Sequence, residues 1–253
     1  MITNYYQKSK KILENKRINK IDLLRNLSKY PVFNLKILKD ITNKNSSYAK
    51  LIVYRLKKAN LIYEIEKNKY SVYSDAFIIA SNLLWPSYIS CWSAVRYYNM
   101  TEQLTSSIFI ITPRTRKKTQ IMFNNAKIVF IKASRKSFFG YKKENYNNFD
   151  IFIAEKEKAL IDSALFKKIS FSEIIEIIKN NKKNINFNLL IDYLLKINNS
   201  TLIKRFGYLL DKLNISTERL KKLINSKYVP LDYALAKKGM KNKKFKVIEN
   251  VVL

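Results

Sequence analysis

The chain has 253 residues, and its 49 lysine and arginine residues against 19 aspartate and glutamate residues give a formal net charge of +30. Hydrophobic residues make up 47% and aromatic residues 13%, so the composition excludes a disordered polycation and predicts a packed core. The absence of histidine excludes His-dependent catalytic triads and HExxH metalloproteases, and the single cysteine excludes an intrachain disulfide and a Cys-pair zinc site.

The length predicts one or two domains. No apolar run reaches the roughly 18 residues that a membrane-spanning helix needs. The first residues, Met1–Lys8, lack the apolar region of a signal peptide, so we expect a cytoplasmic protein without membrane contact. The charge surplus attracts polyanions and favours nucleic acid as a partner, with a merely solvated surface as the alternative.

The first 76 residues predict a winged helix-turn-helix domain. Apolar periodicity indicates helices at about 18–27, 33–41 and 48–59. Asn45, Ser46 and Ser47 form an N-cap cluster before the third helix, because their side-chain oxygens can accept free amides of its first turn. Two β-prone runs, 61–66 and 69–73, flank the polar turn at Lys67 and Asn68.

The third helix separates an apolar stripe from a basic face. The stripe consists of Ala49, Ile52, Val53, Leu56 and Ala59. The opposite face carries Ser47, Lys50, Leu51, Tyr54 and Lys58, and no carboxylate occurs from Thr42 to Tyr63. A helix with such a face suits the major groove of DNA. The alternative is an ordinary amphipathic helix whose lysines only contact water.

Nine residues are therefore candidates for contact with double-stranded DNA. Those expected near the DNA backbone are Ser46, Ser47 and Tyr48. Those expected to face the bases in the groove are Lys50, Tyr54 and Lys58. Those expected at flanking phosphates are Arg55, Lys67 and Lys69, the last two from the hairpin.

Residues 77–253 predict a mixed α/β domain with a helical C-terminal region, which makes the whole chain α+β. The run 76–86 is apolar and irregular, and we place the domain boundary there. The elements expected after it are a helix at 88–98, strands at 107–112, within 120–132 and at 149–153, a turn at 138–141, and a helix at 155–165. Further helices are expected at about 171–180, 187–197, 200–213 and 216–225, and a last strand at 245–252 could close the sheet.

Few patterns in this second domain indicate catalysis. Three glycines cannot form a phosphate loop, and no Asp-x-Asp pair occurs. The densest acidic group is Glu155, Glu157 and Asp162, in which Glu155 and Asp162 share a helix face. We interpret these acids as members of surface or inter-element ion pairs with neighbouring lysines. We expect no enzyme activity, no metal site and no cofactor.

Two further groups have a structural and a functional interpretation. The aromatic residues Trp85, Tyr88, Trp92, Tyr97 and Tyr98 are typical of a core, although aromatic side chains among basic ones can also stack on single-stranded bases. Cys91 is expected to be a small core residue. A basic loop contains Arg114, Arg116, Lys117 and Lys118, which could contact a phosphate backbone or an acidic protein, or simply be solvated.

Several segments together resemble the AbiE-type antitoxins, which are also described as transcriptional regulators of viral-defence (abortive infection) systems. The segments that carry the resemblance are Leu84–Gln103, Ile110–Lys118, Phe139–Tyr141, Ile153–Asp162, Arg205–Leu210 and Val229–Asp232. The first of them is the most specific. The chain departs from the family pattern at Asn99, where a glycine is common, and at Cys91, where an aromatic or small residue is usual.

The resemblance implies an N-terminal winged helix that represses its own operon. It also implies a second domain that counteracts a separately encoded nucleotidyltransferase-type toxin without requiring a stable complex. The positions that match are the third helix, from Ser46 to Lys58, and the block 84–165. No toxin-neutralising residue is carried over from the family.

The first hypothesis is therefore a non-enzymatic, DNA-binding antitoxin and regulator. A second hypothesis is a nuclease or RNA-modifying enzyme with a basic substrate-tracking surface, whose activity would depend on Glu155 and Asp162. A third is a scaffold whose winged helix binds only protein.

Overall fold

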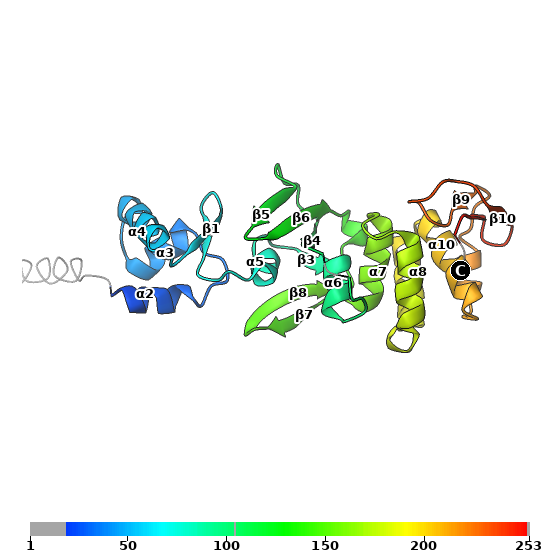
Figure 1. Ribbon diagram of the computed structural model, residues 1–253, viewed down its shortest axis with the longest axis horizontal. Helices are drawn as coiled ribbons and strands as arrows, with labels where there is room; N and C mark the ends of the chain where they lie inside the picture. Colours follow the sequence, from blue (N-terminus) through cyan, green and yellow to red (C-terminus); the bar gives the residue numbers. More distant parts are fainter. Residues whose placement is uncertain (1–18, 104, 252–253) are drawn as a thin grey trace, which may run out of the picture. The chain divides into compact units, whose positions relative to one another are not determined.

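The computed structural model describes residues 19–103 and 105–251, which form an α+β protein (Figure 1). The chain divides into two compact units, Met1–Leu83 and Leu84–Leu253. The division expected from the sequence, after residue 76, falls at the start of a helix that belongs to the first unit. In the described part of the chain, none of the helices has the length and apolar character that crossing a membrane requires.

The first unit contains helices followed by a hairpin and a further helix. Its elements are α2 (Lys20–Leu27), α3 (Leu35–Thr42), α4 (Ser46–Lys58), β1 (Tyr63–Glu66), β2 (Lys69–Ser71) and α5 (Ala76–Asn82). The expected order of three helices and a hairpin is confirmed, while residue 18 of the first predicted helix lies outside the described residues. The run 76–82, expected to be irregular, is helical because Asp75 Oδ1 caps the amides of Phe77 and Ile78.

One apolar core joins the helices of the first unit to its hairpin. Its fully or largely buried members are Leu23, Leu27, Phe33, Leu38, Ala49, Ile52, Val53, Leu56, Ile62 and Tyr70. Phe33 and Tyr70 exchange two backbone hydrogen bonds of 2.8 Å, which pair the segment between α2 and α3 with strand β2. The hairpin is therefore part of the same folded body as the helices.

The second unit contains a six-stranded mixed sheet in the order β5-β6-β4-β3-β8-β7. The strands are β3 (Tyr88–Ser90), β4 (Ser107–Thr112), β5 (Gln120–Phe123), β6 (Ala126–Lys132), β7 (Tyr141–Tyr146) and β8 (Phe149–Ala154). Strands β4 and β6 are parallel, as are β3 and β8, and the other neighbours are antiparallel. Helices α6 (Trp92–Tyr97) and α7 (Lys156–Leu165) pack against this sheet (Figure 1).

Two features of this sheet differ from the sequence-based expectation. The predicted helix 88–98 is wrong in its first turn, because Tyr88–Ser90 form strand β3 and the helix begins only at Trp92. Cys91 lies between them with a φ of 53° and a ψ of −138°, an uncommon positive-φ conformation at the point where the chain turns from strand to helix. Strand β7 was not expected; it follows Gly140, which has a φ of 69°.

Helices and a small second sheet complete this unit. The elements are the 3₁₀ turns η1 (Arg135–Ser137) and η2 (Lys182–Asn184), the helices α8 (Phe171–Asn180), α9 (Phe187–Ile197), α10 (Ser200–Lys212) and α11 (Glu218–Lys221), and the strands β9 (Val229–Pro230), β10 (Met240–Asn242) and β11 (Val247–Glu249). The expected closure of the main sheet by the last strand is wrong, since β11 pairs with β9 and β10 instead. Its neighbour Phe245 is fully buried against Gly207 of α10, which holds this end of the chain on the helices.

Candidate nucleic-acid interface

Helix α4 begins at Ser46 because Asn45 caps it: the Asn45 side-chain oxygen accepts the backbone amide of Tyr48 at 2.9 Å. The predicted apolar stripe is confirmed for Ala49, Ile52, Val53 and Leu56, which are all buried in the core of the first unit. Ala59, the fifth member, is instead the exposed residue that ends the helix. The stripe fixes the rotation of α4 about its axis and thereby decides which residues face outward.

The opposite side of α4 is exposed within its unit. Tyr54 has 63% of its surface accessible, and the apolar Leu51 has 40%. The exposed polar candidates on α4 are Ser46, Ser47, Lys50, Arg55 and Lys58. A large aromatic ring that remains this exposed contributes little to the stability of the fold, so the surface is available for contact with another molecule.

Tyr48 and Lys57 differ from this pattern. The Tyr48 ring is half-buried against the core, and the Lys44 ammonium lies 5.9 Å from its centroid. Lys57 forms an ion pair with Glu64 of the hairpin, so one α4 charge is already neutralised. The remaining basic side chains on α4 keep an outer face without a carboxylate of its own.

The two hairpin lysines occupy different environments. Lys67 lies exposed at the turn between β1 and β2. The Lys69 ammonium donates to the backbone carbonyl of Leu83 at 2.8 Å and forms an ion pair with Glu66 at 2.9 Å. Lys69 is thus engaged within the unit, and Lys67 is the hairpin lysine that extends toward solvent.

The basic loop of the second unit follows β4. Arg114, Lys117 and Lys118 are exposed, whereas the Arg116 guanidinium lies 4.0 Å from the centroid of Phe130 and its Nε donates to the Lys118 carbonyl at 3.2 Å. Three of the four predicted loop contacts therefore present charge to solvent, and Arg116 instead holds the shape of the loop.

The acidic residues around α7 do not lie on a surface, contrary to part of the sequence-based interpretation. Asp162 is fully buried and forms an ion pair with Lys158, which is equally buried. Its other oxygen accepts the Ser90 hydroxyl at 2.8 Å and the Tyr88 hydroxyl at 3.0 Å. Lys158 also donates to the Tyr88 hydroxyl at 3.0 Å. The group is a closed hydrogen-bonded cluster between α7 and β3.

Burial determines the ionisation of this cluster. Loss of contact with water raises the pKa of the Asp162 carboxyl, although Lys158 and the two hydroxyl donors oppose that shift. Burial, together with the Asp162 charge, also raises the pKa of Tyr88. Cys91 is buried nearby, as expected, and burial raises the pKa of its thiol, so it remains protonated.

None of the three acids of this segment shares a partner with another. Glu155 accepts the Tyr193 hydroxyl, and Glu157 accepts the Asn186 backbone amide at 2.7 Å. The contacts of Glu155 and Glu157 with other elements are thus hydrogen bonds and not the predicted ion pairs with lysines, and the ion pair of Asp162 lies within α7. Glu155 and Asp162 do not meet at an open site. Among residues 19–103 and 105–251, no three acid or thiol side chains lie close enough together to hold a metal ion.

The aromatic residues near the start of the second unit divide into two groups. Tyr88 and Trp92 are buried, as the core interpretation predicts. Trp85 is 56% exposed and packs against Phe152, with ring centroids 4.7 Å apart. The sequence could not distinguish the buried aromatic residues from the exposed one, because their side chains are chemically alike. Only the tertiary packing decides which of them is buried.

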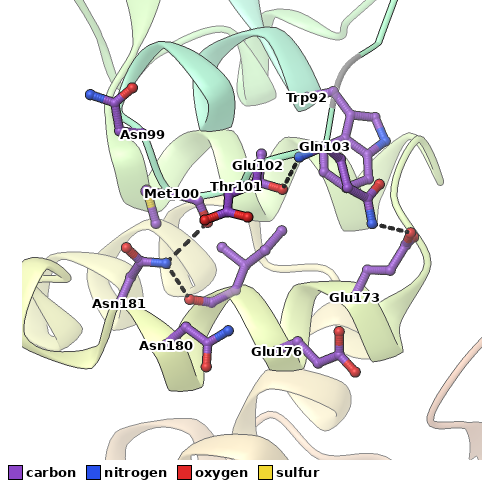
Figure 2. A pocket seen from close by; sticks show the side chains of 11 residues that line it. Trp92, Asn99, Met100, Thr101, Glu102, Gln103, Glu173, Glu176, Asn180 and Asn181 are labelled. Atoms are coloured by element: carbon purple, nitrogen blue, oxygen red, sulfur yellow. Dashed lines mark hydrogen bonds between the residues drawn. The ribbon is translucent and has the colours of Figure 1, made fainter.

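A polar pocket of about 470 Å³ was not expected from the sequence (Figure 2). It lies between the segment after α6 and helix α8, and its lining includes the carboxylates of Glu102, Glu173 and Glu176. Several lining groups are already bonded: Asn181 Nδ2 donates to the carbonyls of Met100 and Ile177 at 3.1 and 2.9 Å, as Figure 2 shows. Glu173 forms a capping box with Ser170. Asn181 and Glu173, at the two ends of α8, thus bond to the segment after α6.

Comparison of the sequence with protein-family models and with curated proteins found no match in either case. The exposed, acid-free face of α4 is the strongest candidate site on the molecule, because its charge and its exposed aromatic ring cannot be explained by packing.

Proposed function

We propose that the chain is a DNA-binding transcriptional autoregulator and the antitoxin of a nucleotidyltransferase-type toxin. The observation that carries the DNA-binding part is the outer face of α4, where Tyr54 is 63% exposed among lysine, arginine and serine side chains. A helix fits the major groove, and such side chains can hydrogen-bond to bases and phosphates.

The architecture of the first unit supports a winged helix-turn-helix. Helices α3 and α4 are joined by three residues, Asn43 to Asn45, and Asn43 has the left-handed φ of 50° that glycine often adopts in such turns. The hairpin that follows α4 would be the wing. Its turn is fastened to α3, since the Asn68 side chain accepts the Leu35 amide at 3.0 Å.

In this mechanism, charge supplies affinity and α4 supplies sequence preference. Exposed Arg55 and Lys67 bind phosphates and release counterions, which makes the affinity strongly dependent on salt. Lys50, Tyr54 and Lys58 face the edges of the bases. Lys69 was predicted to contact a flanking phosphate. In this mechanism it instead positions the hairpin, because its ammonium donates to the Leu83 carbonyl.

The antitoxin part of the proposal is supported by the resemblance of residues 84–165 and of the later segments to AbiE-type antitoxins. On that resemblance the partner is a nucleotidyltransferase-type toxin encoded beside this gene, and a stable complex is not required. The direct test is co-expression of such a toxin with this chain in growing cells. Growth inhibition that the chain does not relieve would contradict the proposal.

The DNA-binding part is tested by measuring affinity for the duplex upstream of the gene and for a shuffled duplex of equal composition. We expect Tyr54→Ala to reduce the ratio of the two affinities about tenfold. We expect Lys67→Gln to weaken both affinities alike and to reduce the salt slope by about one unit.

Matched controls are available after α2. Tyr30 is a second exposed tyrosine, and Lys29 is an exposed lysine bonded to Asn26 at 3.0 Å. Tyr30→Ala and Lys29→Gln should leave both affinities unchanged. The assignment of α4 fails if Tyr54→Ala and Tyr30→Ala have the same effect, or if the wild-type chain binds both duplexes equally.

A further inference from the structure

A second pocket, of about 370 Å³, lies beside the basic loop of the second unit. Its lining consists of Pro86, Pro113, Arg114, Arg135 and Phe138. Two arginine residues thus line one space together with two prolines and one phenylalanine. The volume is within the range of small-molecule sites, which combine apolar walls with a few placed polar groups.

The surroundings of this pocket are strongly cationic. Residues 103–143 contain ten lysine and arginine residues and no aspartate or glutamate. Within the described part of the chain, neither Arg114 nor Arg135 forms an ion pair with a carboxylate, whereas Arg219 is paired with Asp192 at 2.7 Å. Both pocket arginines are exposed, so their donors remain available to an anion.

The walls of the pocket are held in place by local bonds. The Thr112 hydroxyl donates to the Pro86 carbonyl at 2.9 Å and accepts the Arg114 amide at 3.2 Å, which ties both proline segments together. The Phe138 ring lies against Tyr88 and Tyr141, with centroid distances of 5.2 and 5.1 Å. A ligand would therefore meet a largely preformed surface, which lowers the entropy cost of binding.

The geometry points to a nucleotide-binding site, in which Arg114 and Arg135 hold a phosphate group and the Phe138 and proline wall contacts the base. Guanidinium groups bind phosphate through paired, charge-assisted hydrogen bonds. An aromatic wall accepts any base, because every base has a π face. The same chemistry is presented by a free nucleotide and by the phosphorylated end of a strand.

This site is independent of the proposed duplex-binding surface. It uses no residue of α4 or of the hairpin, and it lies wholly within the second unit. Loss of one activity therefore does not imply loss of the other, and Tyr54→Ala should leave nucleotide binding unchanged.

The test is calorimetric titration of the full chain with adenosine 5′-monophosphate, adenosine, inorganic phosphate, and a tetranucleotide with or without a 5′-phosphate. We expect the nucleotide to bind with a dissociation constant of about 10 to 100 µM. Arg114→Gln and Arg135→Gln should each weaken binding about tenfold or more, because each removes charge-assisted hydrogen bonds.

Lys136→Gln is the matched control, since it removes the same positive charge next to Arg135 but lies exposed and outside the pocket lining. It should leave the affinity for the nucleotide unchanged. Tighter binding of the phosphorylated tetranucleotide would support a strand end as the ligand, and tighter binding of the monophosphate a free nucleotide. The site would be overturned if Lys136→Gln weakened binding equally, or if no probe bound. It would also be overturned if the monophosphate bound no more tightly than adenosine or than inorganic phosphate.

Discussion

In α4, the lysines are exposed to solvent, whereas in α7 Lys158 is fully buried. Helix α4 buries four of its 13 residues, all of them apolar. Helix α7 buries eight of its ten, including Glu157, Lys158 and Asp162. Both helices carry basic side chains close to tyrosine, so their composition does not explain the difference.

The difference lies in what neutralises each charge. Lys158 is fully buried, and its ammonium depends on the Asp162 carboxylate, the Tyr88 hydroxyl and the nearby Tyr88 and Phe139 rings in place of water. Lys50 and Lys58 remain hydrated, and they are free to exchange water for a phosphate or a base edge. The charge of Lys158 is therefore used within the fold, whereas the charges of Lys50 and Lys58 are available for binding.

The largest expected effect is that of Lys158→Met. This change leaves the Asp162 carboxylate buried without its cation, and we expect the free energy of unfolding to fall by about 3 to 5 kcal/mol. Urea denaturation of the second unit measures it. The double variant Lys158→Met/Asp162→Asn should recover more than half of the loss, because no charge then remains buried in this cluster. Failure of the double variant to recover would show that packing, and not charge, holds the cluster.

Gly140→Ala should have the next largest effect. Gly140 has a φ of 69°, and an added Cβ would lie 3.0 Å from both Lys158 Cγ and Tyr193 Cε2. Strain and crowding together should cost about 1 to 3 kcal/mol in the same denaturation experiment. Asn43→Ala in the first unit is the control, since Asn43 has a φ of 50° but is exposed. An equal cost at both positions would contradict the crowding at Lys158.

Asn45→Ala should destabilise the first unit by about 1 kcal/mol, because the α4 amide of Tyr48 loses its acceptor. Thermal or urea unfolding of the first unit measures the loss. Ser46→Ala, which removes an exposed hydroxyl one residue later, should have a smaller effect. The reverse order would mean that Asn45 is not the residue that caps α4.

Lys50→Met should have the smallest effect on stability. Lys50 is exposed on α4, and a surface substitution of this kind changes the free energy of unfolding by less than about 0.5 kcal/mol. The same change at Lys158 should be several times more costly. A loss at Lys50 close to that at Lys158 would remove the distinction between the two helices.

The elements that sequence analysis placed well are those with strong local signals. Helices α8 and α9 occupy 171–180 and 187–197, as predicted, because apolar periodicity combines with a cap at Ser170 and at Asn186. The exposed face of α4 was predictable for the same reason, since rotation about the helix axis follows from its apolar stripe.

The elements that were missed depend on partners distant in sequence. Strand β3 has only three residues, and it is a strand because β4 and β8 pair with its two edges. The Lys69 ammonium bonds to the carbonyl of Leu83, and the Asp162 carboxylate accepts the hydroxyl of Ser90. None of these partners lies within the short window in which periodicity or capping can be recognised.

The amino-acid order by itself determined where most helices begin and end, the basic character of the chain, and the outward face of α4, because each follows from neighbours within a few turns of the backbone. Only the tertiary structure decided which charges are buried, how the six strands are ordered, and that Arg114 and Arg135 line one pocket. The physical reason is that these features depend on residues distant in the sequence. Such residues meet, bury one another and pair as strands only when the chain folds.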